Sequence, residues 1–119
     1  MRASPYMQAE AKKFAWDALQ AVDRITRFSA GKTFTDYHGD ELLRSAIERQ
    51  FEIVGEALGK LRQIDPASAS GIPDLPRIVA FRNVLVHAYA SVDNRLVWGV
   101  IEASLASLRS SLDRLLADS

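Results

Sequence analysis

The sequence contains no cysteine, so disulfide bonds and thiolate metal sites are both excluded. Long apolar runs are also missing, because none approaches the roughly 20 residues that a helix needs to cross a bilayer. The first 30 residues lack the apolar core of a secretory signal. We therefore expect a protein with no membrane segment, located in the cytoplasm.

An excess of charge of either sign is the third absence. The chain has 15 Lys and Arg residues and 15 Asp and Glu residues, which gives a formal net charge of +0 at pH 7. A protein that coats nucleic acid by bulk attraction is usually strongly basic, so this balance argues against that class. Chemistry on phosphates would have to depend on a few placed arginines.

What is present is the composition of a small folded protein. With 119 residues, 48% of them hydrophobic and 25% charged, the chain is long enough for one core and too short for two ordinary domains. We expect a single helical domain that covers residues 1–119.

Helical periodicity dominates the chain, and no segment alternates convincingly with the period of a strand. Apolar residues recur at spacings of three and four over residues 4–29, again from residue 40 onward, and once more near the C-terminus. Two turn-rich segments, 29–40 and 65–76, interrupt the pattern. The pattern predicts an all-α bundle of three long helices and one shorter helix.

The shorter helix follows the second interruption. Asp74 is predicted to cap it, with Pro76 in its first turn, where the missing N–H does no harm. This helix would end near Tyr89, and Ser91 or Asp93 would cap the last helix.

Two glycines, Gly55 and Gly59, lie four residues apart within the second long helical segment. A glycine costs about 1 kcal/mol at such a position, so we expect packing or a site to explain them. The absence of their side chains would let another helix approach closely.

The residues "GKT" at 31–33 resemble the end of a phosphate-binding P-loop, but Thr26 stands where that loop needs a glycine. A helix also stands where the loop needs a strand. We therefore expect Lys32 to be a solvated loop residue, and we expect His38 to be exposed in the same turn-rich segment.

A di-metal site in a helical bundle needs Glu-x-x-His pairs. Thr35 and Val84 stand three positions before the two histidines, His38 and His87, so neither histidine belongs to such a pair. We expect neither a metal site nor a cofactor.

The most informative stretch is "FRNVLVHAYA" at 81–90. On an ideal helix Arg82 and Tyr89 point almost the same way, and Asn83 and His87 share a neighbouring direction. Arg82 and His87 diverge by about 140°. They can act on one ligand only if it lies across the helix, or if the helix loosens near its end.

The chemistry available to these side chains suits a phosphodiester. Arg82 can clamp a phosphate with two hydrogen bonds, His87 can transfer a proton near neutral pH, and Asn83 can orient either partner. RNA carries its own nucleophile, the 2′-hydroxyl, so cleavage needs no metal. The residues alone also allow a second interpretation, in which Arg82 and His87 pair with carboxylates or cap a neighbouring helix.

A single histidine cannot easily act as both base and acid. A two-fold dimer that brings the shorter helices of two copies together would supply two histidines and two arginines in one cleft. If catalysis occurs, the dimer interface should therefore run along Arg82 and His87.

The stretch "FRNVLVHAYASVDNRLVW", with "AIERQFEIVGEALGKL" upstream and "IP" at 72–73, resembles the HEPN superfamily, in particular its HepT-like branch. The resemblance extends from about residue 12 to 112. It implies a homodimeric, HEPN-type up-and-down helical bundle with a composite cleft. It also implies a metal-independent endoribonuclease that cleaves RNA and acts as the toxin of a toxin–antitoxin pair.

Carried over residue by residue, the resemblance makes Arg82 and His87 catalytic and Asn83 supporting. Tyr89 becomes the site at which a nucleotidyltransferase-like antitoxin transfers AMP. This chain carries no nucleotidyltransferase signature, so the antitoxin would be a separate chain. Ala88 departs from the pattern, because the residue between the histidine and the tyrosine is often acidic in this branch.

Two other classes remain as alternatives. One is a non-catalytic helical module that binds a nucleotide or a nucleotidyltransferase, which the neutral charge fits somewhat better. The other is a purely structural helical dimer.

Overall fold

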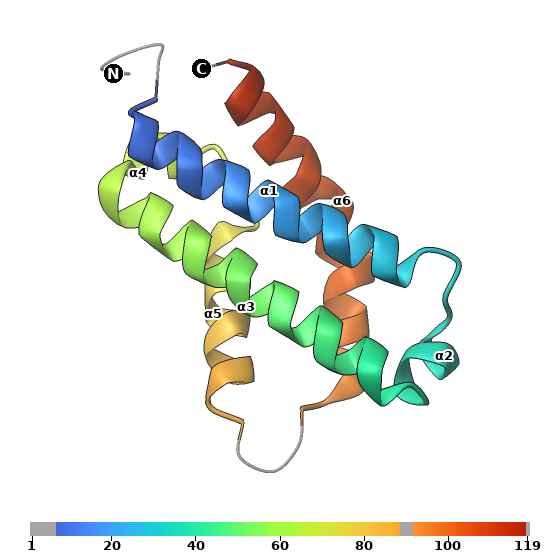
Figure 1. Cartoon of the computed structure of the whole chain (residues 1–119). Coiled ribbons are helices and arrows are strands. Elements are labelled where there is room, and N and C mark those ends of the chain that lie inside the picture. The colour runs from blue at the N-terminus through green and yellow to red at the C-terminus, as the bar shows by residue number, and fades with distance from the viewer. Residues whose placement is uncertain (1–6, 89–91, 119) are drawn as a thin grey trace.

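The computed structural model describes residues 7–88 and 92–118 (Figure 1). This part of the chain forms helices and no strand: α1 (Ala9–Ser29), α2 (Phe34–His38), α3 (Glu41–Ile64), α4 (Pro66–Ala69), α5 (Leu75–Val86) and α6 (Asn94–Ala117). The predicted all-α bundle is confirmed, with α1, α3 and α6 as the long helices and α5 as the shorter one.

The short helices α2 and α4 lie in the two segments predicted as turns. Thr33 and Asp36 form a capping box at the start of α2, and Asp65 accepts a hydrogen bond from the Ser68 N–H at the start of α4. These segments of five and four residues are too short for apolar periodicity to reveal a helix. Local capping therefore produces helices that the pattern missed.

Helix α1 packs against both α3 and α6. Its buried face is mostly alanine, which lets the neighbouring helices approach closely: Ala11, Ala15, Ala18, Ala21, Val22 and Ile25. It begins at Ala9 rather than near residue 4, because the backbone of Gln8 is extended. The predicted start was therefore several residues too early.

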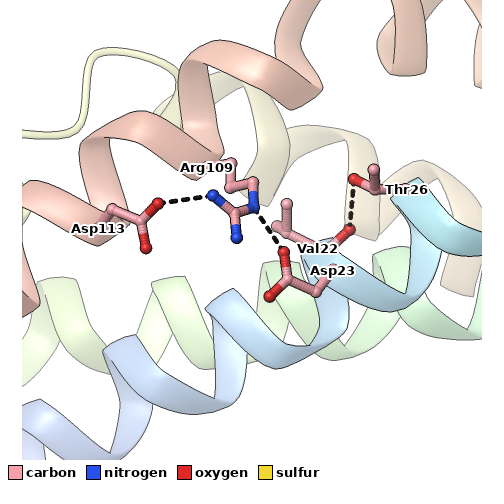
Figure 2. A network of polar contacts seen from close by, with 5 residues as sticks. All are labelled: Val22, Asp23, Thr26, Arg109 and Asp113. Carbon is pink, nitrogen blue, oxygen red and sulfur yellow. Dashed lines mark hydrogen bonds and ion pairs between the residues drawn. The ribbon is translucent and has the colours of Figure 1, made fainter.

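An ion-pair network also joins α1 to α6, as Figure 2 shows. Arg109 of α6 donates from Nε to Asp23 of α1 at 2.6 Å and from a terminal nitrogen to Asp113 at 2.7 Å. The hydrogen bond to Asp23, followed by the charges of both carboxylates, raises the pKa of Arg109 further above its usual value. The network is solvent-exposed, so it orients the two helices more than it stabilises them.

Helix α2 is held in place by one buried aromatic residue. The Tyr37 ring is fully buried and lies 5.4 Å, centroid to centroid, from the ring of Trp98 on α6. Burial raises the pKa of the Tyr37 hydroxyl well above its usual value. From α3, the Arg44 guanidinium donates a hydrogen bond to the carbonyl of His38 at the end of α2.

Capping at the last two helices differs from expectation in one case. Asp93 caps α6, because its carboxylate accepts from the N–H groups of Arg95 and Leu96 at 2.9 and 3.3 Å. Ser91, the other candidate, lies outside the described residues. Asp74 precedes α5, but its side chain makes no capping hydrogen bond, so that prediction was wrong. Its backbone is already helical (φ −80°, ψ −7°), whereas a capping residue is typically extended.

Helix α5 crosses α3 at Gly55. A Cβ atom at Gly55 would lie 2.7 Å from Cγ of Arg82 and closer still to its Cβ. Beside this crossing, the rings of Phe51 and Phe81 pack edge to face at 5.2 Å. No atom lies within 4 Å of a Cβ placed at Gly59. The expected close approach is therefore confirmed for Gly55 and wrong for Gly59.

In the part of the chain that the structure describes, no helix is both long enough and apolar enough to cross a membrane.

The two glycines of α3 provide a matched pair for testing the crossing. Gly55→Ala should lower the free energy of unfolding by about 1–3 kcal/mol, because the added methyl overlaps the Arg82 side chain. Gly59→Ala should raise it by about 0.5–1 kcal/mol, because alanine favours the helix and meets no neighbour. Urea unfolding followed by circular dichroism, at one protein concentration, measures both. Equal effects of the two variants would contradict the close crossing.

Candidate functional site

Arg82 lies on α5 where that helix crosses α3. The glycine at position 55 makes room for the first carbons of its side chain. Its Nε atom is buried and has no hydrogen-bond partner among the described residues, while a terminal nitrogen donates to Oδ1 of Asn83 at 3.2 Å. The stem of the arginine is therefore fixed by packing, and only part of its hydrogen-bonding capacity is used.

No carboxylate in residues 7–88 and 92–118 forms an ion pair with Arg82. An arginine held in an apolar crossing is ordinarily paired, because a partly buried unpaired charge is costly. Pairing with a carboxylate was the second interpretation left open by the sequence, and the described residues do not supply such a partner for Arg82. The guanidinium is available to an anionic ligand.

His87 is the first residue after α5, which ends at Val86 rather than near Tyr89 as predicted. Its backbone N–H donates to the carbonyl of Asn83 at 3.1 Å, and its side chain is exposed. The backbone angles of His87 (φ −99°, ψ 10°) depart from those of the preceding helix. The helix thus ends three residues earlier than expected, and the chain loosens at the histidine itself.

Asn83 is hydrogen-bonded to both Arg82 and His87. Its side chain accepts from Arg82, and its backbone carbonyl accepts from the N–H of His87. In the described chain no hydrogen bond joins the His87 imidazole to Arg82 or Asn83. The chain therefore brings Arg82 and Asn83 together, whereas the imidazole of His87 forms no hydrogen bond with either of them in the described residues.

Tyr89, the predicted modification site, lies outside the described residues. Ala88, which stands where the related pattern is often acidic, is exposed.

Exposed apolar side chains accompany the polar residues of α5. Val84 is 52% exposed and Val86 is 45% exposed, and Leu96 in the first turn of α6 is 45% exposed. An isolated exposed valine is ordinary, but these two alternate with Asn83 and His87 at the end of one helix. The end of α5 therefore carries two exposed valines on different sides of the helix, because residues two apart point about 200° apart.

His38, expected to be simply exposed, belongs to an arrangement that the sequence did not reveal. Its ring stacks on that of Phe34 at 5.4 Å, and its Nδ1 lies 3.0 Å from Nδ2 of Asn94. The partners lie 56 residues apart, so no local pattern could have indicated the contact. Across the described ranges, no group of three or more His, Asp and Glu side chains is arranged to hold a metal ion.

Comparison with known proteins assigns this sequence to a family. The family described as Ribonuclease HepT-like matches residues 18–115. The "Probable ribonuclease HepT" of Thermococcus cleftensis is 28% identical over 112 residues, covering 92% of this chain and 98% of the relative. The "Putative RNase MJ1380" of Methanocaldococcus jannaschii is 24% identical over 106 residues, covering 87% and 94% respectively.

No solved structure gives a significant match. The family match includes every described residue of the candidate site and all of α3 and α5. Because it extends over most of the sequence, the chain belongs to the HepT-like ribonuclease family of the HEPN superfamily.

Proposed function

We propose that this chain is the toxin of a toxin–antitoxin pair, a metal-independent endoribonuclease whose site combines Arg82 and His87 from two copies. The observation that carries the proposal is the Arg82 guanidinium, which is fixed at the α3–α5 crossing and has no carboxylate partner in the described chain. The exposed His87 lies at the end of the same helix. Membership of a ribonuclease family makes an RNA phosphate the natural anion for this arginine.

The proposed reaction uses the substrate's own nucleophile. His87 of one copy removes the proton from the 2′-hydroxyl, and the 2′-oxygen bonds to phosphorus as the bond from phosphorus to the 5′-oxygen breaks. His87 of the other copy gives a proton to the leaving 5′-oxygen. Arg82 stabilises the negative charge that develops on the phosphoryl oxygens, and Asn83 orients the guanidinium. The products are a 2′,3′-cyclic phosphate and a 5′-hydroxyl.

Dimerisation is supported by two features of α5. One copy has a single histidine at the site, whereas the reaction needs both a base and an acid. The exposed Val84 and Val86 are apolar side chains at this end of the helix that a second copy would cover. A two-fold axis beside α5 would bring both histidines and both arginines into one cleft.

Silencing is proposed to act on Tyr89. A separate nucleotidyltransferase-like antitoxin would transfer AMP from ATP to the tyrosine oxygen with release of pyrophosphate. Tyr89 stands two residues after His87 in the sequence. The added phosphate would compete with RNA for Arg82, because both bring negative charge to the same guanidinium.

A second candidate function is a non-catalytic module that binds a nucleotidyltransferase or a nucleotide. The zero net charge of the chain favours it to some degree. Incubation of the purified protein with RNA in the presence of EDTA separates the two, because the ribonuclease cleaves and the module does not.

The catalytic residues are tested by single substitutions on α5 and at its end. His87→Ala should lower kcat for RNA cleavage by about 10²–10⁴-fold, the usual contribution of general acid–base catalysis. Arg82→Ala should lower it by about 10²–10³-fold, because charge stabilisation is lost. Arg77→Ala removes the other arginine of α5, which is exposed, and should keep full activity. Light scattering and circular dichroism check the dimer and the fold. A His87→Ala protein that cleaves RNA at the normal rate would refute the proposal.

The modification is tested by intact mass. Co-expression with the nucleotidyltransferase encoded beside it should increase the mass of this chain by whole AMP units. Tyr89→Phe should remove the increase and escape silencing, because the accepting hydroxyl is absent. A mass increase that persists in Tyr89→Phe would assign the modification to another residue.

A further inference from the structure

A second group of side chains lies outside the Arg82 site, between α2 and the first turn of α6. The Arg95 guanidinium lies over the Phe34 ring, 4.3 Å from its centroid, and the His38 ring stacks on the same phenylalanine. Asn94 is hydrogen-bonded to His38, and Lys32 precedes α2. We refer to Lys32, Phe34, His38, Asn94 and Arg95 as the α2–α6 cluster.

The α2–α6 cluster is held by the fold and not by the cluster residues alone. Tyr37 is buried against Trp98 and so anchors α2, the helix that carries both stacked rings, Phe34 and His38. The capping box of Thr33 and Asp36 fixes the start of α2. On the other side, Asp93 caps α6 and so fixes the turn that carries Asn94 and Arg95. The cluster therefore requires little reorganisation to bind a ligand.

Two open cavities adjoin the cluster, and both are lined by Phe34 and Arg95. The first, of about 470 Å³, also contacts Lys32, and the second, of about 650 Å³, also contacts His38 and Asn94. Each has the capacity for a group as large as a nucleotide. The stacked Phe34 and Arg95 therefore separate the two cavities, and His38 extends the platform on the side of the second.

The charges around the cavities leave cations available. Within the described chain neither Lys32 nor Arg95 forms an ion pair. Of the acidic groups nearby, Asp93 accepts two backbone N–H groups. Asp36 accepts the N–H of Thr33, which with the Thr33 hydroxyl and, to a smaller extent, the charge of Lys32 lowers the pKa of its carboxyl. Glu102, which lines the first cavity, is the remaining carboxylate.

The cluster lies at the same end of the bundle as the Arg82 site. In Figure 1 the end of α5 and the start of α6 both lie at the end opposite to the chain termini. Asn94 follows His87 by seven residues, so their Cα atoms are at most about 25 Å apart in one protomer. A single RNA strand at His87 could therefore extend to the cluster.

We propose that the α2–α6 cluster binds the single-stranded RNA substrate beside the cleavage point. Arg95 and Lys32 contact phosphates, and an unstacked base lies against the exposed faces of Arg95 and His38, where Asn94 offers its amide. Arginine and aromatic side chains are the usual platform for bases in single-stranded RNA. The inference rests on the proposed ribonuclease function, and it explains how a chain without net charge holds RNA.

Paired substitutions distinguish RNA binding at the α2–α6 cluster from a general effect of removing two positive charges. The test variant is Lys32→Ala with Arg95→Ala, and the control is Arg62→Ala with Arg114→Ala, which removes two exposed cations from the last turns of α3 and α6. The test variant should raise KM for a single-stranded RNA oligonucleotide at least about 10-fold with kcat within about twofold, since base stacking and phosphate contacts are lost. The control should change neither value by more than about twofold.

Binding is measured separately in the His87→Ala background by fluorescence anisotropy of the same labelled RNA. Adding Lys32→Ala and Arg95→Ala should weaken binding about 10-fold and reduce its dependence on salt, whereas the control pair should not. His38→Ala should weaken binding less, without changing the salt dependence, because it removes a ring and no permanent charge. Circular dichroism confirms that each variant is folded.

The outcomes distinguish this inference from the proposed function. A wild-type protein that cleaves RNA, with KM and binding unchanged in the test variant, would overturn the α2–α6 subsite alone. Loss of binding to the nucleotidyltransferase with unchanged RNA affinity would overturn it in favour of a protein interface. Absence of cleavage by the wild type refutes the ribonuclease proposal, while the anisotropy comparison still decides whether the cluster binds RNA.

Discussion

The candidate site depends on the close crossing of α3 and α5 at Gly55. Because position 55 lacks a side chain, the first carbons of Arg82 can pack directly against the α3 backbone. This packing restricts the position of the guanidinium beside α5. Its Nε is buried and has no hydrogen-bond partner in the described chain. A long, flexible side chain becomes a preorganised cation, which is the property that charge stabilisation in catalysis requires.

The rest of the fold keeps this crossing and the neighbouring helix ends in place. The alanine face of α1 allows α3 and α6 to pack closely against it, and the Phe51–Phe81 contact supports α5. The buried Tyr37 joins α2 to α6 at the same end of the molecule. As a result, α2 and the start of α6 are held against each other, and the end of α5 also lies at the end of the bundle opposite to the chain termini (Figure 1).

The arrangement also explains how a neutral chain can act on a polyanion. Four cations of the described chain form ion pairs with nearby carboxylates: Lys13, Arg49, Lys60 and Arg109. Arg82 and Arg95 form no ion pair within the described residues, and packing holds each of them: Arg82 against Gly55 and Arg95 over the Phe34 ring. Cations fixed in this way favour contacts at particular phosphates over bulk attraction.

The sequence by itself determined the all-α class, the three long helices, the shorter helix and the Arg82–His87 pattern, because apolar periodicity and motif spacing are local properties. It could not distinguish Gly55 from Gly59, since only the position of α5 makes one of them necessary. Nor could it show that Asp74 leaves α5 uncapped, or that His38 pairs with Asn94. Those features depend on backbone angles and on contacts between residues far apart in the chain, which arise only when the helices pack. Tertiary structure therefore decided which glycine is required for close packing of two helices, and which polar side chains form hydrogen bonds.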